Sequence, residues 1–263
     1  MALPFPVMSI PAANFPDRES EVDREGEVES PVTPAPDADN VGEYLISSRS
    51  FAEYKAMFML TDSDLRSRLL DCPAGASSFT AQASTLGSPV TAVDPVYAMA
   101  PPALREMVKR ESGRGSAHTA AGVDRYRWDF YGDLQGYREM RERAADIFAR
   151  DIEDHPERYV AAALPDLPFA DGQFDLVLSS HFLFTYADRL DEDVHHAALL
   201  ELHRICRHQV RVFPLLDQAG RALPHMTGAV LGRLTRQGIA WRIVQVPYEF
   251  QRGGNEMLVI SAD

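Results

Sequence analysis

The chain has 263 residues, of which 45% are hydrophobic and 25% charged, enough apolar material for one large hydrophobic core. No apolar run approaches the roughly 18 to 20 residues that a membrane-spanning helix needs, and no basic segment precedes the apolar start of the chain. The two cysteines, Cys72 and Cys206, form no CxxC pair, so we expect no disulfide framework, no metal site and a reducing, cytoplasmic location. The net charge of −13 argues against nucleic acid as a partner, because Lys and Arg supply most nucleic-acid affinity.

Residues 1–40 differ in composition from the rest of the chain. They contain seven of the 18 prolines and nine acidic residues against two arginines, with no apolar periodicity. Such a segment cannot bury enough surface to offset the entropy of ordering, so we expect a disordered leader ahead of one domain over residues 41–263. Solubility is its simplest role, and a partner-binding tail is the alternative.

The first predicted elements form a strand–helix–strand unit. Ser50 and Glu53 have the spacing of a capping box ahead of a short amphipathic helix. Residues 68–71 then read as a short buried strand, residues 76–87 as a helix, and residues 90–94 as a second strand. The order of these elements predicts a parallel, right-handed βαβ unit.

The connection after the second strand is abnormally long. About 60 residues separate Asp94 from the next predicted strand, and helix-forming stretches occur near residues 102–111 and 134–151. We therefore expect a helical insertion over about residues 97–157. Between its helices, four aromatic residues lie among two arginines, which is compatible equally with anchoring of the insertion and with a lid that lines a substrate pocket. The aromatic residues are Tyr126, Trp128, Phe130 and Tyr131.

The alternation of strands and helices continues to the end of the chain. Strands are predicted at residues 158–164, 174–179 and 209–215, with helices at residues 191–207 and 223–237. Two final β-rich runs, residues 239–250 and 256–261, are joined by a glycine loop of hairpin type. The sequence thus predicts an α/β fold in which five parallel strands are followed by an antiparallel hairpin.

The carboxyl ends of the first two strands are the expected ligand site. In an open α/β sheet, ligands bind beyond these ends beside the switch point, where Asp71 and Asp94 lie. Pro73 and Gly75 would make the first turn tight enough for backbone amides to approach a ligand. A carboxylate in the position of Asp94 is placed to accept both hydroxyl groups of a ribose.

Residues 164–181, LPDLPFADGQFDLVLSSH, make this site more specific. They resemble the LPFxDGxFDxV stretch of class I S-adenosylmethionine-dependent methyltransferases. DCPAG at residues 71–75, SHFLFTY at residues 180–186 and YEFQRGGN at residues 248–255 resemble a bacterial branch of that family. The resemblance extends over about residues 41–263. It implies a Rossmann-like fold with a seven-stranded sheet, an antiparallel C-terminal strand and helices on both faces. It also implies that residues 69–75 correspond to motif I and that Asp94 is the ribose-binding acid.

Two positions depart from the family pattern. The usual DxGxGxG becomes DCPAGAS at residues 71–77, which keeps only the middle glycine, Gly75. The acid that often accepts from the adenine amino group is replaced by Ala163, so Asp166 or a backbone carbonyl would have to accept in its place.

The resemblance assigns candidate residues to the site. The cofactor contacts it implies are Arg49, Tyr54, Asp71, Cys72, Pro73, Ala74, Gly75, Asp94, Leu164, Ser180 and His181. His181 follows the fourth strand, where it would either take a proton from the acceptor or hydrogen-bond the cofactor or backbone. The candidate acceptor contacts are Tyr126, Trp128, Tyr131 and Tyr186.

Four histidines near the predicted helix over residues 191–207 make a weaker pattern. Because no carboxylate at i+4 completes a metal set, we expect a histidine-rich helix surface. These histidines are His195, His196, His203 and His208.

The function predicted is direct in-line methyl transfer from S-adenosylmethionine to a small-molecule acceptor. The main alternative is a protein of the same fold that binds the cofactor but performs cyclisation or rearrangement, or serves as a binding partner. A nicotinamide-dependent dehydrogenase would share the βαβ unit but would explain neither residues 164–181 nor the terminal hairpin. The sequence does not predict an oligomeric state.

Overall fold

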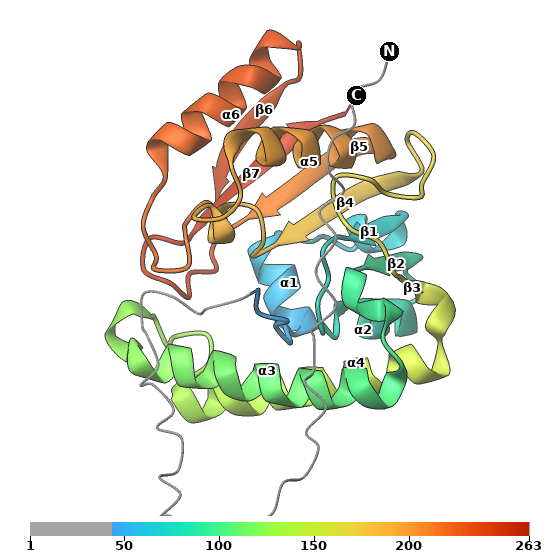
Figure 1. Ribbon diagram of the computed structural model, residues 1–263, viewed down its shortest axis with the longest axis vertical. Coiled ribbons are helices and arrows are strands. Elements are labelled where there is room, and N and C mark those ends of the chain that lie inside the picture. The colour runs from blue at the N-terminus through green and yellow to red at the C-terminus, as the bar shows by residue number, and fades with distance from the viewer. Residues whose placement is uncertain (1–43, 263) are drawn as a thin grey trace, which may run out of the picture. The chain divides into compact units, whose positions relative to one another are not determined.

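The computed structural model describes residues 44–262, so the predicted leader lies outside the described residues. Its centre is a seven-stranded sheet in the order β3-β2-β1-β4-β5-β7-β6 (Figure 1). Strands β1 to β5 pair in parallel, and β7 runs antiparallel to both β5 and β6, as the sequence predicted. The strands are β1 (Leu69–Asp71), β2 (Val90–Val93), β3 (Tyr159–Val160), β4 (Phe174–Ser180), β5 (Cys206–Phe213), β6 (Trp241–Gln245) and β7 (Glu256–Ser261).

Local sequence signals account for where several helices begin and end. Ser50 and Glu53 form the predicted capping box of α1, with hydrogen bonds in both directions between side chain and backbone. Gly87 and Gly238 have positive φ angles just beyond α2 and α6, a conformation that glycine adopts at least cost. The helices are α1 (Phe51–Met57), α2 (Phe79–Thr85), α3 (Pro101–Ala121), α4 (Leu134–Asp154), α5 (Glu192–Ile205) and α6 (Pro224–Arg236).

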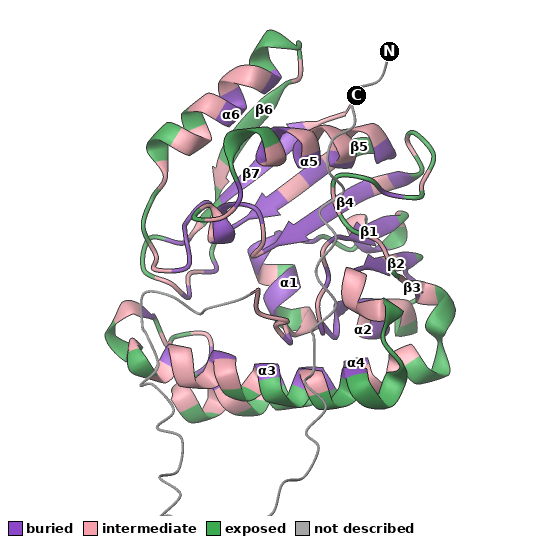
Figure 2. Cartoon of the chain, viewed as in Figure 1, coloured by how far each residue is buried: buried purple, intermediate pink, exposed green. Residues whose placement is uncertain are grey.

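Most of the sheet is buried, apart from the edge strand β6 (Figure 2), and hydrophobic clusters lie on both of its faces. One hydrophobic cluster joins α5 and α6 to alternate strand residues such as Leu70 and Val177. A second cluster joins α1 and α2 to the residues that point the other way, such as Leu69 and Leu178. Because successive strand side chains alternate between faces, these short apolar strands bury both sides and require helices on each.

The insertion is a helical hairpin, and its first helix is longer than predicted. Figure 1 shows α3 and α4 side by side, with α1 between this hairpin and the ends of the central strands. The predicted helix over residues 102–111 continues to Ala121, through Gly113 and Gly115. A Cβ on Gly115 would lie 3.1 Å from the Leu45 side chain, so this glycine allows residue 45 to pack closely on α3. Tertiary contact therefore outweighs the low helix propensity of glycine.

Two of the predicted strands are shorter than expected. The strand expected at residues 158–164 is reduced to β3, and that expected at residues 239–250 ends at Gln245. The following residues leave the sheet because Val246, Tyr248 and Phe250 are buried among the aromatic residues of the insertion.

The histidines of α5 do not form a surface cluster. His195 is fully buried and its ring contacts Phe184, while His196 is buried with its Nε2 3.1 Å from the Gln237 side chain. Within residues 44–262, no group of three or more possible metal ligands occurs. In the same part of the chain, no helix is both long and apolar enough to cross a membrane.

Candidate functional site

The loop after β1, residues 72–78, lies at the carboxyl ends of three neighbouring strands. The Cys72 N–H donates to Leu178 O of β4 and the Ala74 N–H donates to Val93 O of β2, both at 2.9 Å. The Cys72–Pro73 peptide bond is cis, and Gly75 has a φ of +56°. The loop is thus held between β2 and β4 at the predicted switch point of the sheet. Burial raises the pKa of Cys72 well above its usual value, in agreement with a structural role for this thiol.

Asp94, directly after β2, accepts a hydrogen bond from the loop over residues 72–78. Its Oδ2 accepts from the Gly75 N–H at 3.0 Å and its Oδ1 accepts from the Val96 N–H at 3.1 Å. Burial raises the pKa of Asp94 to about 6, although the two N–H donors lower it in part. Each carboxylate oxygen has a second lone pair, so Asp94 can still accept from two ligand hydroxyl groups.

Asp71, at the end of β1, offers a buried acceptor. Its Oδ1 accepts from the Tyr54 hydroxyl at 3.0 Å, whereas its Oδ2 has no hydrogen-bond donor among the described residues. Burial raises the pKa of Asp71 well above its usual value, and the nearby Asp94 raises it further. Tyr54, predicted to contact the cofactor, therefore holds Asp71, and its ring stacks on Phe79 with centroids 4.7 Å apart.

Residues 44–50 form a strap that joins this loop to the insertion. Ser47 O and Arg49 O accept from the N–H groups of Ala76 and Ser78, at 3.1 and 2.8 Å. The Leu45 N–H donates to the hydroxyl of Tyr186 at 2.7 Å. Tyr186, predicted as an acceptor contact, is thus a buried anchor for the strap.

His181 and Ser180 end β4 beside the loop. His181 adopts a φ of +50°, and its Nδ1 lies 2.9 Å from Ser180 Oγ. Burial lowers the pKa of His181 well below its usual value, and the positive charges of Arg49 and Arg141 lower it further. The imidazole is therefore neutral at pH 7 but a weak base, which favours the hydrogen-bonding alternative over proton removal.

A buried ion cluster lies next to His181, and the sequence reasoning missed its central members. Glu53 is fully buried, accepts from Arg141 of α4 at 3.0 Å and from Arg49 at 3.3 Å, and makes a second ion-pair contact with Arg141 at 2.7 Å. Burial raises the pKa of Glu53, but the two arginines and the Ser50 N–H outweigh this effect and leave it below its usual value. Arg141 shares the face of α4 that carries Tyr137, Ala144, Ala145 and Phe148. An arginine on an apolar helix face was the signal that would have identified it.

The predicted aromatic lid residues pack mainly against the protein itself. Tyr126 and Tyr131 are buried, and the Tyr131 hydroxyl donates to Glu53 at 2.7 Å and lies 2.6 Å from that of Tyr248. Trp128 is half-buried against the rings of Tyr126, Tyr137 and Phe250. These contacts anchor the insertion on the link between β6 and β7.

The predicted adenine side of the site lies beyond β3. The Leu164–Pro165 peptide bond is cis, and the Asp166 N–H donates to Ala163 O at 3.1 Å, so this segment makes a tight turn. Asp166 is exposed, which leaves its carboxylate accessible to a ligand.

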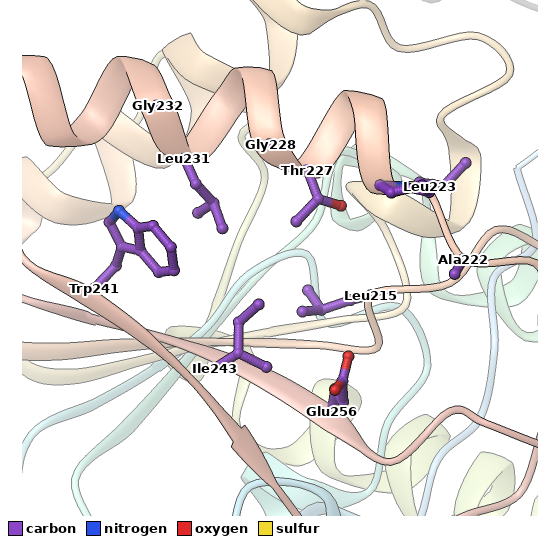
Figure 3. Close-up of a pocket in the computed structure, with 11 residues that line it drawn as sticks. Leu215, Ala222, Leu223, Thr227, Gly228, Leu231, Gly232, Trp241, Ile243 and Glu256 are labelled. Carbon is purple, nitrogen blue, oxygen red and sulfur yellow. The ribbon is translucent and has the colours of Figure 1, made fainter.

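A separate hollow of about 480 Å³ lies between α6 and β6 (Figure 3). Leu231, Trp241 and Ile243 contribute apolar side chains to it, and the carboxylate of Glu256 lies at one end. Strands β4, β5 and β7 separate β6 from β1, and none of the predicted site residues lines this hollow.

Comparison with known proteins identifies relatives of this chain. Residues 111–213 match the family model of a methyltransferase domain. Protein MJ0045 of Methanocaldococcus jannaschii is 29% identical over 222 residues, which cover 84% of this chain and 97% of that protein. Since that relative is archaeal, the similarity is not confined to bacteria.

Several solved methyltransferase structures are also similar. Magnesium protoporphyrin IX methyltransferase (ChlM) from Synechocystis PCC 6803, with bound SAM, is 13% identical with a TM-score of 0.44, covering 80% of this chain and 76% of that one. The 1,6-didemethyltoxoflavin-N1-methyltransferase of Burkholderia thailandensis is 17% identical with a TM-score of 0.40, covering 80% and 74%. The methyltransferase-domain match over residues 111–213 and the seven-stranded sheet with an antiparallel β7 agree with the class I S-adenosylmethionine-dependent methyltransferase fold that the sequence resemblance implied.

Proposed function

We propose that this protein transfers a methyl group from S-adenosylmethionine directly to a small-molecule acceptor, in the cytoplasm. The observation that carries the proposal is the placement of Asp71, at the end of β1, and Asp94, just after β2, on either side of the loop over residues 72–78 at the switch point of a methyltransferase-type sheet. When bound, the cofactor supplies a methyl group already activated by its sulfonium.

The residues at the strand ends fit this cofactor. Asp94 retains acceptor capacity for two ribose hydroxyl groups, and the orphaned Asp71 Oδ2 is a buried acceptor suited to an ammonium group. A Cβ on Gly75 would lie 3.1 Å from Ser47 O, so only glycine keeps the loop this close to the strap. Leu164 and Asp166, on the predicted adenine side, would contact the adenine.

The protein contributes mainly binding and orientation. Ser180 and His181 would face the reacting groups from the end of β4, and the strap and insertion would exclude water. Holding donor and acceptor about 3 to 3.5 Å apart and in line supplies most of the rate in such a transfer. We assign His181 a hydrogen-bonding role, because its low pKa makes it a poor base.

The test combines cofactor binding with turnover. Calorimetry should show that S-adenosylhomocysteine binds the full-length protein, and incubation of metabolite extracts with methyl-labelled S-adenosylmethionine should yield a labelled small molecule. Binding without labelled product would support the non-methylating alternative. Absence of cofactor binding would contradict the proposal.

A further inference from the structure

Strand β6 forms one edge of the sheet, and its outer side faces away from every other described strand. It pairs only with β7 among the described strands, and Trp241, Arg242, Ile243 and Gln245 are exposed (Figure 2). Edge strands that stay unpaired are usually protected by lysines, prolines or bulges. The five residues of β6 carry one charge, that of Arg242, and their register with β7 runs without a shift. The edge is therefore well suited to pair with another strand.

The backbone groups of β6 divide into an inward and an outward set. The Val246 N–H donates to Asn255 O at 2.8 Å, and Ala240 O accepts from the Ser261 N–H at 2.9 Å. Hydrogen-bonded pairs alternate with non-bonded pairs along an antiparallel ladder, so the even-numbered residues of β6 also bond to β7. The odd-numbered residues between them direct their N–H and C=O groups away from β7, toward the edge of the sheet.

The outward residues are Trp241, Ile243 and Gln245, and each offers one N–H and one C=O at the edge. The side chains of Trp241 and Ile243 are 37% and 40% exposed and line the hollow between α6 and β6 (Figure 3). The Trp241 indole N–H donates to the Thr235 hydroxyl of α6 at 2.9 Å, which orients the ring. The edge thus presents a row of backbone donors and acceptors beside an apolar hollow.

This edge is complementary to itself. A twofold axis perpendicular to the sheet brings two copies of β6 together in antiparallel order and leaves both α6 helices on one face. With the axis at Ile243, Trp241 lies opposite Gln245 of the second copy, and the two Ile243 residues lie opposite each other. Every outward N–H and C=O of these residues then has a partner. The two Ile243 side chains meet on the face that carries both hollows, so each covers apolar surface of the other copy.

Charge and proline select this register. An axis at Arg242 would place two guanidinium groups directly opposite each other, and like charges in that position are destabilising. An axis at Val244 would place Trp241 opposite Pro247, which has no N–H to donate. With the axis at Ile243, Arg242 instead lies opposite the apolar side chain of Val244, on the face away from α6.

We propose that two copies of this chain associate through β6 and join their sheets into one continuous sheet across a twofold axis at Ile243. A strip about 17 Å long and about 20 Å deep, which takes in β6 and α6, covers about 350 Å² on each copy, less than half of the ~800 Å² that a standard stable interface buries. We therefore expect a dimer that forms in the micromolar range. This proposal does not depend on the proposed function.

Sedimentation equilibrium of the full chain, from micromolar to near-millimolar concentration, tests the association. We expect the mean mass to rise from that of one chain toward that of two. A protein that remains monomeric over the whole range would overturn the proposal.

Two variants with the same change in net charge locate the seam. Ile243→Lys should raise the Kd of the dimer by about tenfold or more, because two ammonium groups replace an apolar pair at the axis. Leu86→Lys alters a side chain that is 66% exposed and lies just beyond α2, so it should leave the Kd unchanged. Equal Kd values for the two variants would show that β6 is not the interface.

Amide hydrogen exchange, measured at single residues, tests the pairing itself. The N–H groups of Trp241, Ile243 and Gln245 should be protected only at concentrations at which the mass doubles, whereas those of Arg242 and Val244 should be protected at every concentration. Protection of the outward set in a monomer would show that another segment of the chain covers the edge. Dimerisation without this protection would place the interface elsewhere, and either result would contradict the proposal.

Discussion

At the scale of single residues, the site depends on carboxylates buried at unusual cost. Asp71 and Asp94 lie at the ends of adjacent strands, and burial raises the pKa of each. A protein that keeps two such groups close together sacrifices stability, which is typical of ligand sites. The role of Asp94 can be tested directly.

Asp94→Ala should weaken S-adenosylhomocysteine binding by about 2 to 3 kcal/mol, because two charge-assisted hydrogen bonds of about 1.5 kcal/mol each would be lost. Calorimetry measures the change, and Asp129→Ala, whose side chain is 81% exposed, is the matched control. Wild-type affinity in Asp94→Ala would show that the ribose binds elsewhere.

The pKa of Asp94 also predicts a pH dependence. With a native pKa of about 6, above the unfolded value near 3.9, Asp94 stabilises the fold most below pH ~4 and loses this contribution as the pH rises through 6. The ligand hydroxyl groups need the ionised form, so cofactor affinity should fall below pH ~6. Unfolding and binding of wild type and Asp94→Ala, compared at pH 4.5 and 7.5, would reveal both trends. A stability difference between them that is independent of pH would contradict this assignment.

At the scale of elements, one arginine joins three segments. Arg141 of α4 binds Glu53 of α1 and donates to Ser48 O of the strap at 3.0 Å. Arg141→Ala should destabilise the protein by about 3 to 5 kcal/mol, because it leaves Glu53 buried without its main partner. Arg143→Ala, on the exposed face of the same helix, should change stability by less than about 0.5 kcal/mol. Denaturant unfolding of both variants measures the two losses of stability. Similar losses in Arg141→Ala and Arg143→Ala would contradict the role of Arg141 as the main partner of Glu53.

The aromatic segment between α3 and α4 gives a second prediction at this scale. Since Trp128 packs on Tyr126, Tyr137 and Phe250, Trp128→Ala should cost about 2 to 3 kcal/mol of stability while S-adenosylhomocysteine affinity stays within about twofold. Thermal unfolding and calorimetry on the same variant measure both quantities. Full stability with a raised acceptor KM would instead support the lid hypothesis.

At the scale of the whole molecule, we expect the strap, residues 44–50, to be the first part of the chain that the fold requires. Removal of residues 1–40 should leave melting temperature and cofactor affinity nearly unchanged, because so charged and proline-rich a segment has little to bury. Removal of residues 1–50 should abolish cofactor binding, since it deletes Ser47 and Arg49, whose carbonyl groups hold the loop after β1. A drop of several degrees in the shorter deletion would show that the leader contributes to stability.

Local patterns in the sequence determined the fold class and predicted where the site lies. The apolar strand runs, the capping box of Ser50 and Glu53 and the resemblance of residues 164–181 gave the parallel sheet, its antiparallel end and the strand ends at Asp71 and Asp94. These features depend on contacts within a few residues or on the connection between consecutive elements. They can therefore be inferred without coordinates.

Only the tertiary structure decided which long-range neighbours these residues have. The sequence indicated only a capping role for Glu53. Its pairing with Arg141, 88 residues away, follows from how the insertion folds back on α1. Likewise, only the structure shows that the Tyr54 hydroxyl donates to Asp71 and that the Tyr186 hydroxyl accepts from the Leu45 N–H of the strap. Burial and charge pairing between distant segments depend on packing geometry, which no local pattern encodes.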